Sequence, residues 1–155
     1  MKNFYLVLEK IKQFLESHSQ VNLVTTGDIF DVDLNKQSIF PLSHIIINSA
    51  NLEGQVIRFN ISVLAIDIVN ETKENPREQD VPFYGTNNVQ DILNTQLAVC
   101  NALIKELEKG DLHFDKYQLQ GSPQCLPFQD RFENLLAGWN CTFDVITANT
   151  EISVC

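Results

Sequence analysis

The chain has 155 residues, 44% of them hydrophobic and 20% charged, and its formal net charge is −9. This length suits a single domain with a core of its own, and the apolar content argues against a disordered chain. An acidic chain without a run of Lys and Arg has little attraction for nucleic acid or anionic membranes. The N-terminal segment lacks an uninterrupted apolar stretch, so we expect no signal peptide, no membrane span and synthesis in a reducing cytoplasm.

The first predicted element is an amphipathic helix over Asn3–Ser17. Its apolar residues recur at helical spacing, with Lys, Glu and Gln on the opposite side. The apolar stripe consists of Phe4, Val7, Leu8, Ile11, Phe14 and Leu15. We expect this stripe to pack on the core.

A run of β-structure follows the helix. Val21–Thr26 and Ile29–Leu34 read as strands on either side of Gly27, which permits a turn or a bulge. His44–Asn48 is predicted to be a short apolar strand, and Ala50–Gly54 to be the turn after it. A tight turn before the next strand implies antiparallel pairing.

The segment Gln55–Asn70 predicts one long strand whose apolar character changes along its length. The odd-numbered residues from Ile57 to Ala65 are apolar, which makes Ile61 a core residue. From Leu64 the even-numbered positions become apolar as well. A strand has two faces, so either both faces of this end are buried or a bulge turns its side chains to one face. A partner subunit is one structure that could bury the second face.

A polar segment, 71–85, separates this strand from the next element and contains Pro76. It has little to bury, so we expect a mobile loop in which Glu71–Asp80 contacts another subunit, with a passive surface loop as the alternative.

A second amphipathic helix is predicted after this loop. Asn87 or Asn88 can cap its start, Asp91 lies in the first turn, and Gly110 follows the last turn. A continuous apolar stripe from Val89 to Leu107 is expected to face the core.

The last third of the chain returns to β-structure. Leu112–Gln120 predicts a strand that Gly121–Pro123 turns, and Trp139–Val145 alternates strictly as a strand does. Leu126–Leu136 suits either a short helical turn or an irregular strand, and residues 148–155 are expected to form an extended tail. The order of elements predicts a single α+β domain, 1–155, with a mainly antiparallel sheet flanked by two amphipathic helices.

Residue patterns for catalysis are missing from the sequence. The three histidines lie in different predicted elements, and the four cysteines are scattered without a C-x-x-C spacing, so no metal site is supported. Cys100 and Cys141 lie on apolar faces, where buried reduced thiols are usual. Without an activated nucleophile or a phosphate-binding loop, we expect no enzyme activity and no cofactor.

A group of acidic residues together with one histidine supports a different interpretation. Asp28, Asp31 and Asp33 resemble a carboxylate cluster, although they alternate with apolar residues as a solvated strand face would. His44, in an apolar strand, is interpreted as a structural histidine. The alternative function is a small soluble ligand-binding domain or enzyme with a pocket near Asp28–Asp33 and His44.

The layout as a whole resembles a known protein family. Pro41-Leu42-Ser43-His44 begins a strand meander, the long strand ends in a charged loop, a capped helix follows, and Phe132, Trp139 and Phe143 lie late in the chain. This order is similar to that of the tail terminator and related head–tail joining (neck) proteins of tailed bacteriophages. The resemblance rests on element order and size over nearly the whole chain.

The resemblance implies a structural virion protein, made in the host cytoplasm, that forms a sixfold or twelvefold ring at the head–tail junction. Its expected partners are copies of itself, the portal or connector, and tail tube proteins, while genomic DNA passes an acidic channel without sticking. Within such a ring, the two-sided strand end and the charged loop are the candidate subunit interface. The candidate residues are Leu64, Ile66, Ile68, Glu71, Lys73, Glu74, Arg77, Glu78 and Asp80.

Overall fold

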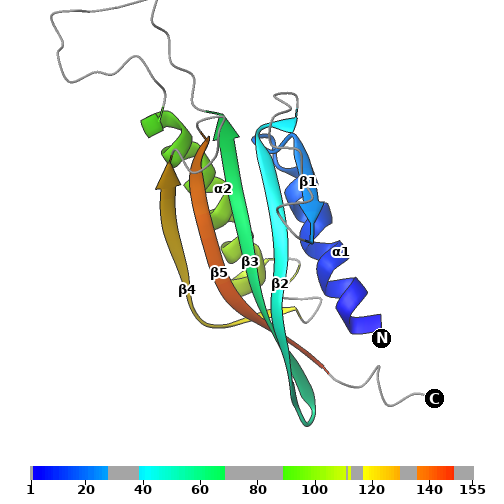
Figure 1. Cartoon of the computed structure of the whole chain (residues 1–155). Helices are drawn as coiled ribbons and strands as arrows, with labels where there is room; N and C mark the ends of the chain where they lie inside the picture. The colour runs from blue at the N-terminus through cyan, green and yellow to red at the C-terminus, as the bar shows by residue number, and fades with distance from the viewer. Residues whose placement is uncertain are drawn as a thin grey trace, which may run out of the picture.

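The computed structural model describes residues 2–27, 39–68, 89–110, 112, 117–129 and 136–148. These residues form a five-stranded sheet in the order β1-β2-β3-β5-β4, with two helices packed on it (Figure 1). The elements are α1 (Lys2–Ser17), β1 (Leu23–Thr26), β2 (Leu42–Glu53), β3 (Val56–Ile68), α2 (Val89–Lys109), β4 (Gln118–Gln129) and β5 (Leu136–Ala148). Neighbouring strands are antiparallel except β1 and β2, which are parallel. The predicted α+β fold with a mainly antiparallel sheet is confirmed.

Both helices cover the same face of the sheet, which we call the helix face. α1 packs on β1 and β2, and α2 packs on β3, β4 and β5. The predicted stripes supply the contact, because Val7, Ile11 and Leu15 of α1 and Leu103 and Leu107 of α2 are buried. The main core therefore lies between the helices and the sheet, and the opposite face, called the open face, carries no helix of the described residues.

β3 is covered on both faces, as its sequence requires. Its odd-numbered residues from Ile57 to Ala65, including the predicted core residue Ile61, lie in the main core. On the open face Ile66 belongs to a second apolar cluster, called the end cluster. The buried residues of the end cluster are Phe40, Leu42, Ile66, Phe128 and Leu136. Residues of the same chain therefore cover Ile66 on the open face. They come from β2, β4, β5 and the segment before β2.

The observed strand β2 is longer than the short strand predicted over His44–Asn48, and it includes most of the predicted turn Ala50–Gly54. Instead of ending at Asn48, the strand continues to Glu53, and the chain turns at Gly54, where φ is +71°. A bulge between Ile47 and Ser49 inserts one extra residue, after which pairing with β3 resumes. Continuous pairing with a long neighbour overrides the weak strand propensity of Asn, Ser and Ala here.

The turn predicted at Gly121–Pro123 is wrong. Gly121–Pro123 lies inside the strand, as a register shift between Gln120 and Gln124, rather than between two strands. Gly121 has φ +76°, which a bulge can require and which glycine adopts without strain. The ambiguous segment that starts at Leu126 continues β4 to Gln129.

The strand predicted over Leu112–Gln120 begins only at Gln118, and Leu112 is helical. The predictions for Gly27 and Gly110 agree with the structure. β1 ends at Thr26, directly before Gly27, which has φ +100°, and the amide of Gly110 closes α2 with a 3.0 Å hydrogen bond to the Glu106 carbonyl oxygen. The predicted strand 29–34, the loop 71–85 and the tail after Ala148 lie outside the described residues.

Candidate functional site

The open face carries a row of polar side chains that crosses three strands. Asn48, at the bulge of β2, donates from Nδ2 to Asn60 Oδ1 and to Ser62 Oγ, both at 2.8 Å. Asn60 donates in turn to Asp144 Oδ1 at 2.7 Å, and the hydroxyls of Ser62 and Thr142 are 3.0 Å apart. Asn48 follows Ile47, whose partner Ile61 lies in the main core, so ordinary strand alternation places Asn48 on the open face beside this row.

Charged residues continue the row toward the β2–β3 turn. Arg58 makes a two-pronged contact with Glu53, at 2.8 Å and 3.1 Å, and its Nη1 lies 3.7 Å from Asp144 Oδ2. The hydrogen bond from Arg58 lowers the pKa of the Glu53 carboxyl. Because the pair is exposed, water screens it and it stabilises the fold little.

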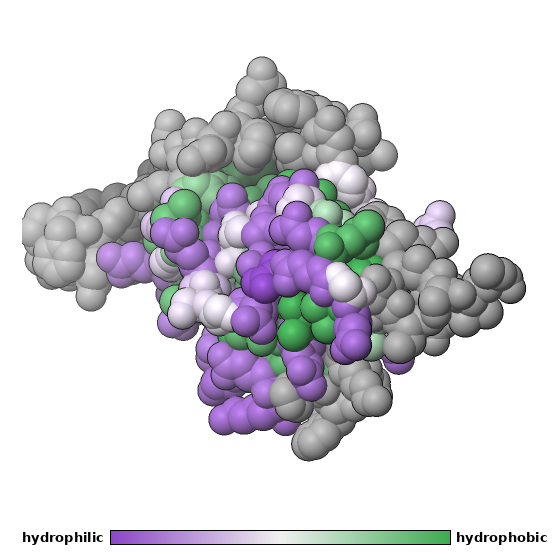
Figure 2. Space-filling view, turned by 90° about the horizontal axis from the view of Figure 1, so that it is seen from below, coloured by the Kyte–Doolittle hydropathy of each residue, from purple (hydrophilic) through white to green (hydrophobic). Residues whose placement is uncertain are grey.

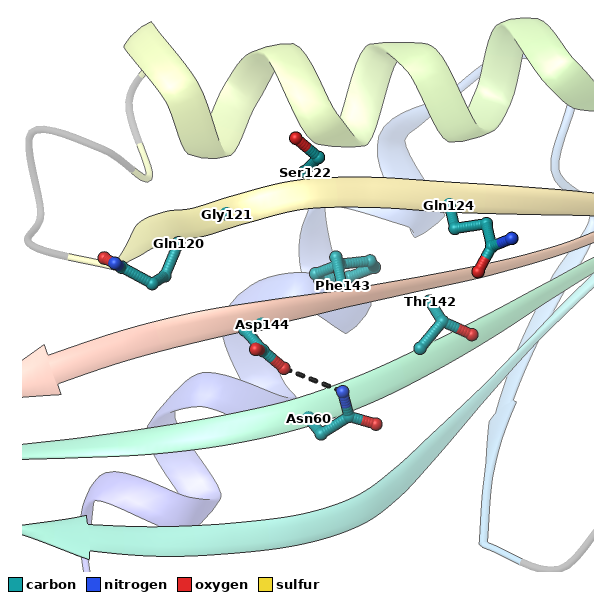
Figure 3. Close-up of a pocket in the computed structure, with 8 residues that line it drawn as sticks. All are labelled: Asn60, Gln120, Gly121, Ser122, Gln124, Thr142, Phe143 and Asp144. Atoms are coloured by element: carbon teal, nitrogen blue, oxygen red, sulfur yellow. Dashed lines mark hydrogen bonds between the residues drawn. The ribbon is translucent and has the colours of Figure 1, made fainter.

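A shallow hollow of about 200 Å³ opens on this face beside the bulge of β4. Figure 3 shows its side chains arising from β3, β4 and β5, with the hydrogen bond between Asn60 and Asp144 joining β3 to β5. The lining residues are Asn60, Gln120, Gly121, Ser122, Gln124, Thr142, Phe143 and Asp144. Amides, hydroxyls and one carboxylate offer hydrogen bonds to a polar surface.

The outer edge of β2 is the second feature of the site. β1 pairs only with Leu42–Ile45, so along the rest of β2 no strand of the described residues occupies that edge. We call this stretch, Ile46–Glu53, the distal edge. The residues from Asn48 onward are exposed, and Leu52 is 68% exposed.

The distal edge belongs to a hairpin that projects beyond the ends of both helices (Figure 1). Viewed from that end, the described surface is mostly hydrophilic with small hydrophobic patches (Figure 2). An unpaired strand edge with an exposed leucine is a template for pairing with another chain.

The candidate interface predicted from the sequence divides into two parts. Ile66 is fully buried in the end cluster, so its assignment to a subunit interface is wrong; its cover is intramolecular. Leu64 and Ile68 are partly buried and pack against that cluster. The remaining candidates, Glu71, Lys73, Glu74, Arg77, Glu78 and Asp80, lie outside the described residues.

His44 is a structural residue. Its side chain is fully buried, with Nδ1 2.6 Å from Thr25 Oγ1 and Nε2 2.8 Å from the Gly27 carbonyl oxygen. These contacts tie β2 to the end of β1 and occupy both ring nitrogens, as interpreted from the sequence. The aspartates of the alternative pocket, Asp28, Asp31 and Asp33, lie outside the described residues.

Three of the four cysteines converge, which sequence spacing did not reveal. Cys100 on α2, Cys125 on β4 and Cys141 on β5 have Sγ atoms within 4.8 Å of one another. Cys125 and Cys141 are register partners across the two strands, with their Sγ atoms 3.0 Å apart. Hydrogen bonds from Cys100 and then Cys141 lower the pKa of Cys125 to about 6, and the contact with Cys125 raises that of Cys100.

Within the residues that the structure describes, neither helix is both long and apolar enough to cross a membrane. Compared with known proteins, the chain matches no family model and no curated sequence.

Proposed function

We propose that the protein is a structural subunit that assembles into a ring at the head–tail junction of a tailed bacteriophage. As a tail terminator or neck ring it would join the tail to the portal or connector. The distal edge of β2 carries this proposal, because it leaves backbone donors and acceptors open over Ile46–Glu53 in the described part of the chain.

The two outer edges of the sheet are unlike, which favours a head-to-tail contact. The other edge strand, β4, contains Pro123 and Pro127, which have no N–H to donate to an added strand. The distal edge contains no proline and is the better acceptor of a strand from a neighbour. A heterologous contact of this kind generates a ring when its rotation closes.

The open face supports assembly in a second way. Its polar row is held in place by hydrogen bonds between strands, so a neighbouring subunit or docking ring would meet a preformed surface. The net charge of −9 suits a channel that DNA crosses without binding. The observed order of helix, strands, helix and strands is also the order on which the resemblance rests.

The test compares two exposed leucines on opposite edges of the sheet. Leu52 lies on the distal edge and is 68% exposed, and Leu126 lies on β4 and is 54% exposed. Leu52→Asp should reduce the native mass of the purified protein from a ring to a monomer without lowering its melting temperature. Leu126→Asp, with the same change in charge and polarity, should leave the ring intact.

Two outcomes would contradict the proposal. One is a monomeric wild-type protein at micromolar concentration. The other is a ring that persists in Leu52→Asp, which would place the subunit contact away from the distal edge.

A further inference from the structure

The Cys100, Cys125 and Cys141 side chains, called the thiol cluster, come from three different elements. The packing of α2 on β4 and β5 brings Cys100 over the cross-strand pair Cys125–Cys141. Cys100 and Cys141 are buried at 2% and 1% exposure, whereas Cys125 is only partly buried. Of the three thiols, Cys125 on the edge strand β4 is therefore the most accessible to solvent.

We infer that the thiol cluster binds one Cu(I) ion through three thiolate sulfurs. Thiolates are soft ligands and select Cu(I), Zn²⁺ or iron–sulfur clusters over hard cations. A metal–sulfur bond of about 2.3 Å places three sulfurs around an ion at roughly 4 Å from one another. The Sγ atoms lie within 4.8 Å of one another, and only Cys125 and Cys141, at 3.0 Å, must move apart.

The number of ligands decides between the soft ions. Zn²⁺ in a structural site takes four protein ligands. Among the residues that the structure describes, no histidine, aspartate or glutamate joins the three cysteines. Three sulfurs, with no fourth ligand among the described residues, suit the low coordination number of Cu(I). The surrounding core, which includes Leu103 and Val145, keeps water away from the ion.

A disulfide is the competing use of these thiols. Cys125 and Cys141 face each other directly, and oxidation could join them at the S–S bond length of about 2.05 Å. A disulfide between Cys125 and Cys141 would not involve Cys100, although the Cys100 Sγ atom lies within 4.8 Å of the other two Sγ atoms. A metal site uses all three sulfurs.

The experiment is an anaerobic titration of the reduced full-length protein with Cu(I) in the presence of a competing chelator. We expect one ion per chain and an X-ray absorption spectrum with about three sulfurs at roughly 2.3 Å. Cys125→Ser should abolish this uptake. It changes the least buried of the three thiols, so its melting temperature should stay close to that of the wild type.

Cys155→Ser is the matched control, because it removes the one cysteine that the inferred site does not use, and it should bind Cu(I) as the wild type does. Failure of the wild type to retain Cu(I) against the chelator would overturn the inference. So would retention by a folded Cys125→Ser variant, loss in Cys155→Ser, or a preference for Zn²⁺ with a fourth ligand. The readout is independent of ring formation, so the proposed function could fail while this inference holds.

Discussion

A β-carbon on Gly138 would lie 1.8 Å from the carbonyl oxygen of Ala65. Gly138 lies on β5 beside Ile66 of β3, at the edge of the end cluster. We therefore predict that Gly138→Ala forces the two central strands apart and lowers the free energy of unfolding by about 3 kcal/mol, the upper end of the range for overpacking. Urea denaturation followed by circular dichroism measures this change. An unchanged midpoint would show that the strands do not approach so closely.

Trp139 links the centre of the sheet to α2. Its Nε1 donates a 2.7 Å hydrogen bond to the carbonyl oxygen of Leu93. Trp139→Phe keeps an aromatic ring on the core but removes this donor, so we expect a loss of about 1 kcal/mol in the free energy of unfolding. The measurement is a denaturant titration of both proteins. Equal stability would mean that the indole nitrogen makes no net contribution.

Asp67 gives the fold a pH dependence that can be isolated by mutation. Burial raises the pKa of its carboxyl, and the hydrogen bond from the Ile68 amide offsets this only in part. The protonated form is therefore favoured in the folded state, and its contribution to stability is lost as the pH rises through the folded pKa.

The matched variant is Asp67→Asn, which retains the oxygen that accepts the Ile68 amide. It should melt at a higher temperature than the wild type at neutral pH. The difference should shrink as the pH falls toward the unfolded pKa of an aspartate. A wild type that is the more stable of the two at neutral pH would contradict the direction of the shift.

Ile66 and Ile61 test the two covers of β3 separately. Both side chains are fully buried, Ile61 on the helix face and Ile66 in the end cluster. Ile61→Ala and Ile66→Ala should each cost about 2–5 kcal/mol of unfolding free energy. Chemical denaturation of both variants provides the measurement. If Ile66→Ala were as stable as the wild type, the chain's own cover of that face would be in doubt.

Repeating patterns in the sequence predicted the regular elements well. Apolar residues repeat at helical spacing in both helices and alternate with polar residues in β3 and β5. These patterns are local, and the side chains that they predict to be apolar-facing are buried in the fold. The two-sided apolar end of β3 also indicated correctly that both faces are covered. What covers Ile66 could not be predicted, because Phe128 and Leu136 reach it from distant parts of the chain.

The turn predicted at Ala50–Gly54 occurs only at its last residue, Gly54, and the turn predicted at Gly121–Pro123 is a bulge inside β4. Glycine, proline and asparagine mark both turns and bulges, and only the neighbouring strand decides between them. The candidate sites show the same limit. Cys125 and Cys141 become neighbours through strand register, and Cys100 joins them through helix packing, neither of which residue spacing contains.

The most direct test of the proposed function is electron microscopy of the purified wild-type protein, supported by its native mass. We predict annular particles of uniform size with a central opening. Their mass should be six or twelve times that of the 17.6 kDa chain. Monomers or compact dimers without an opening, at the same concentration, would contradict it.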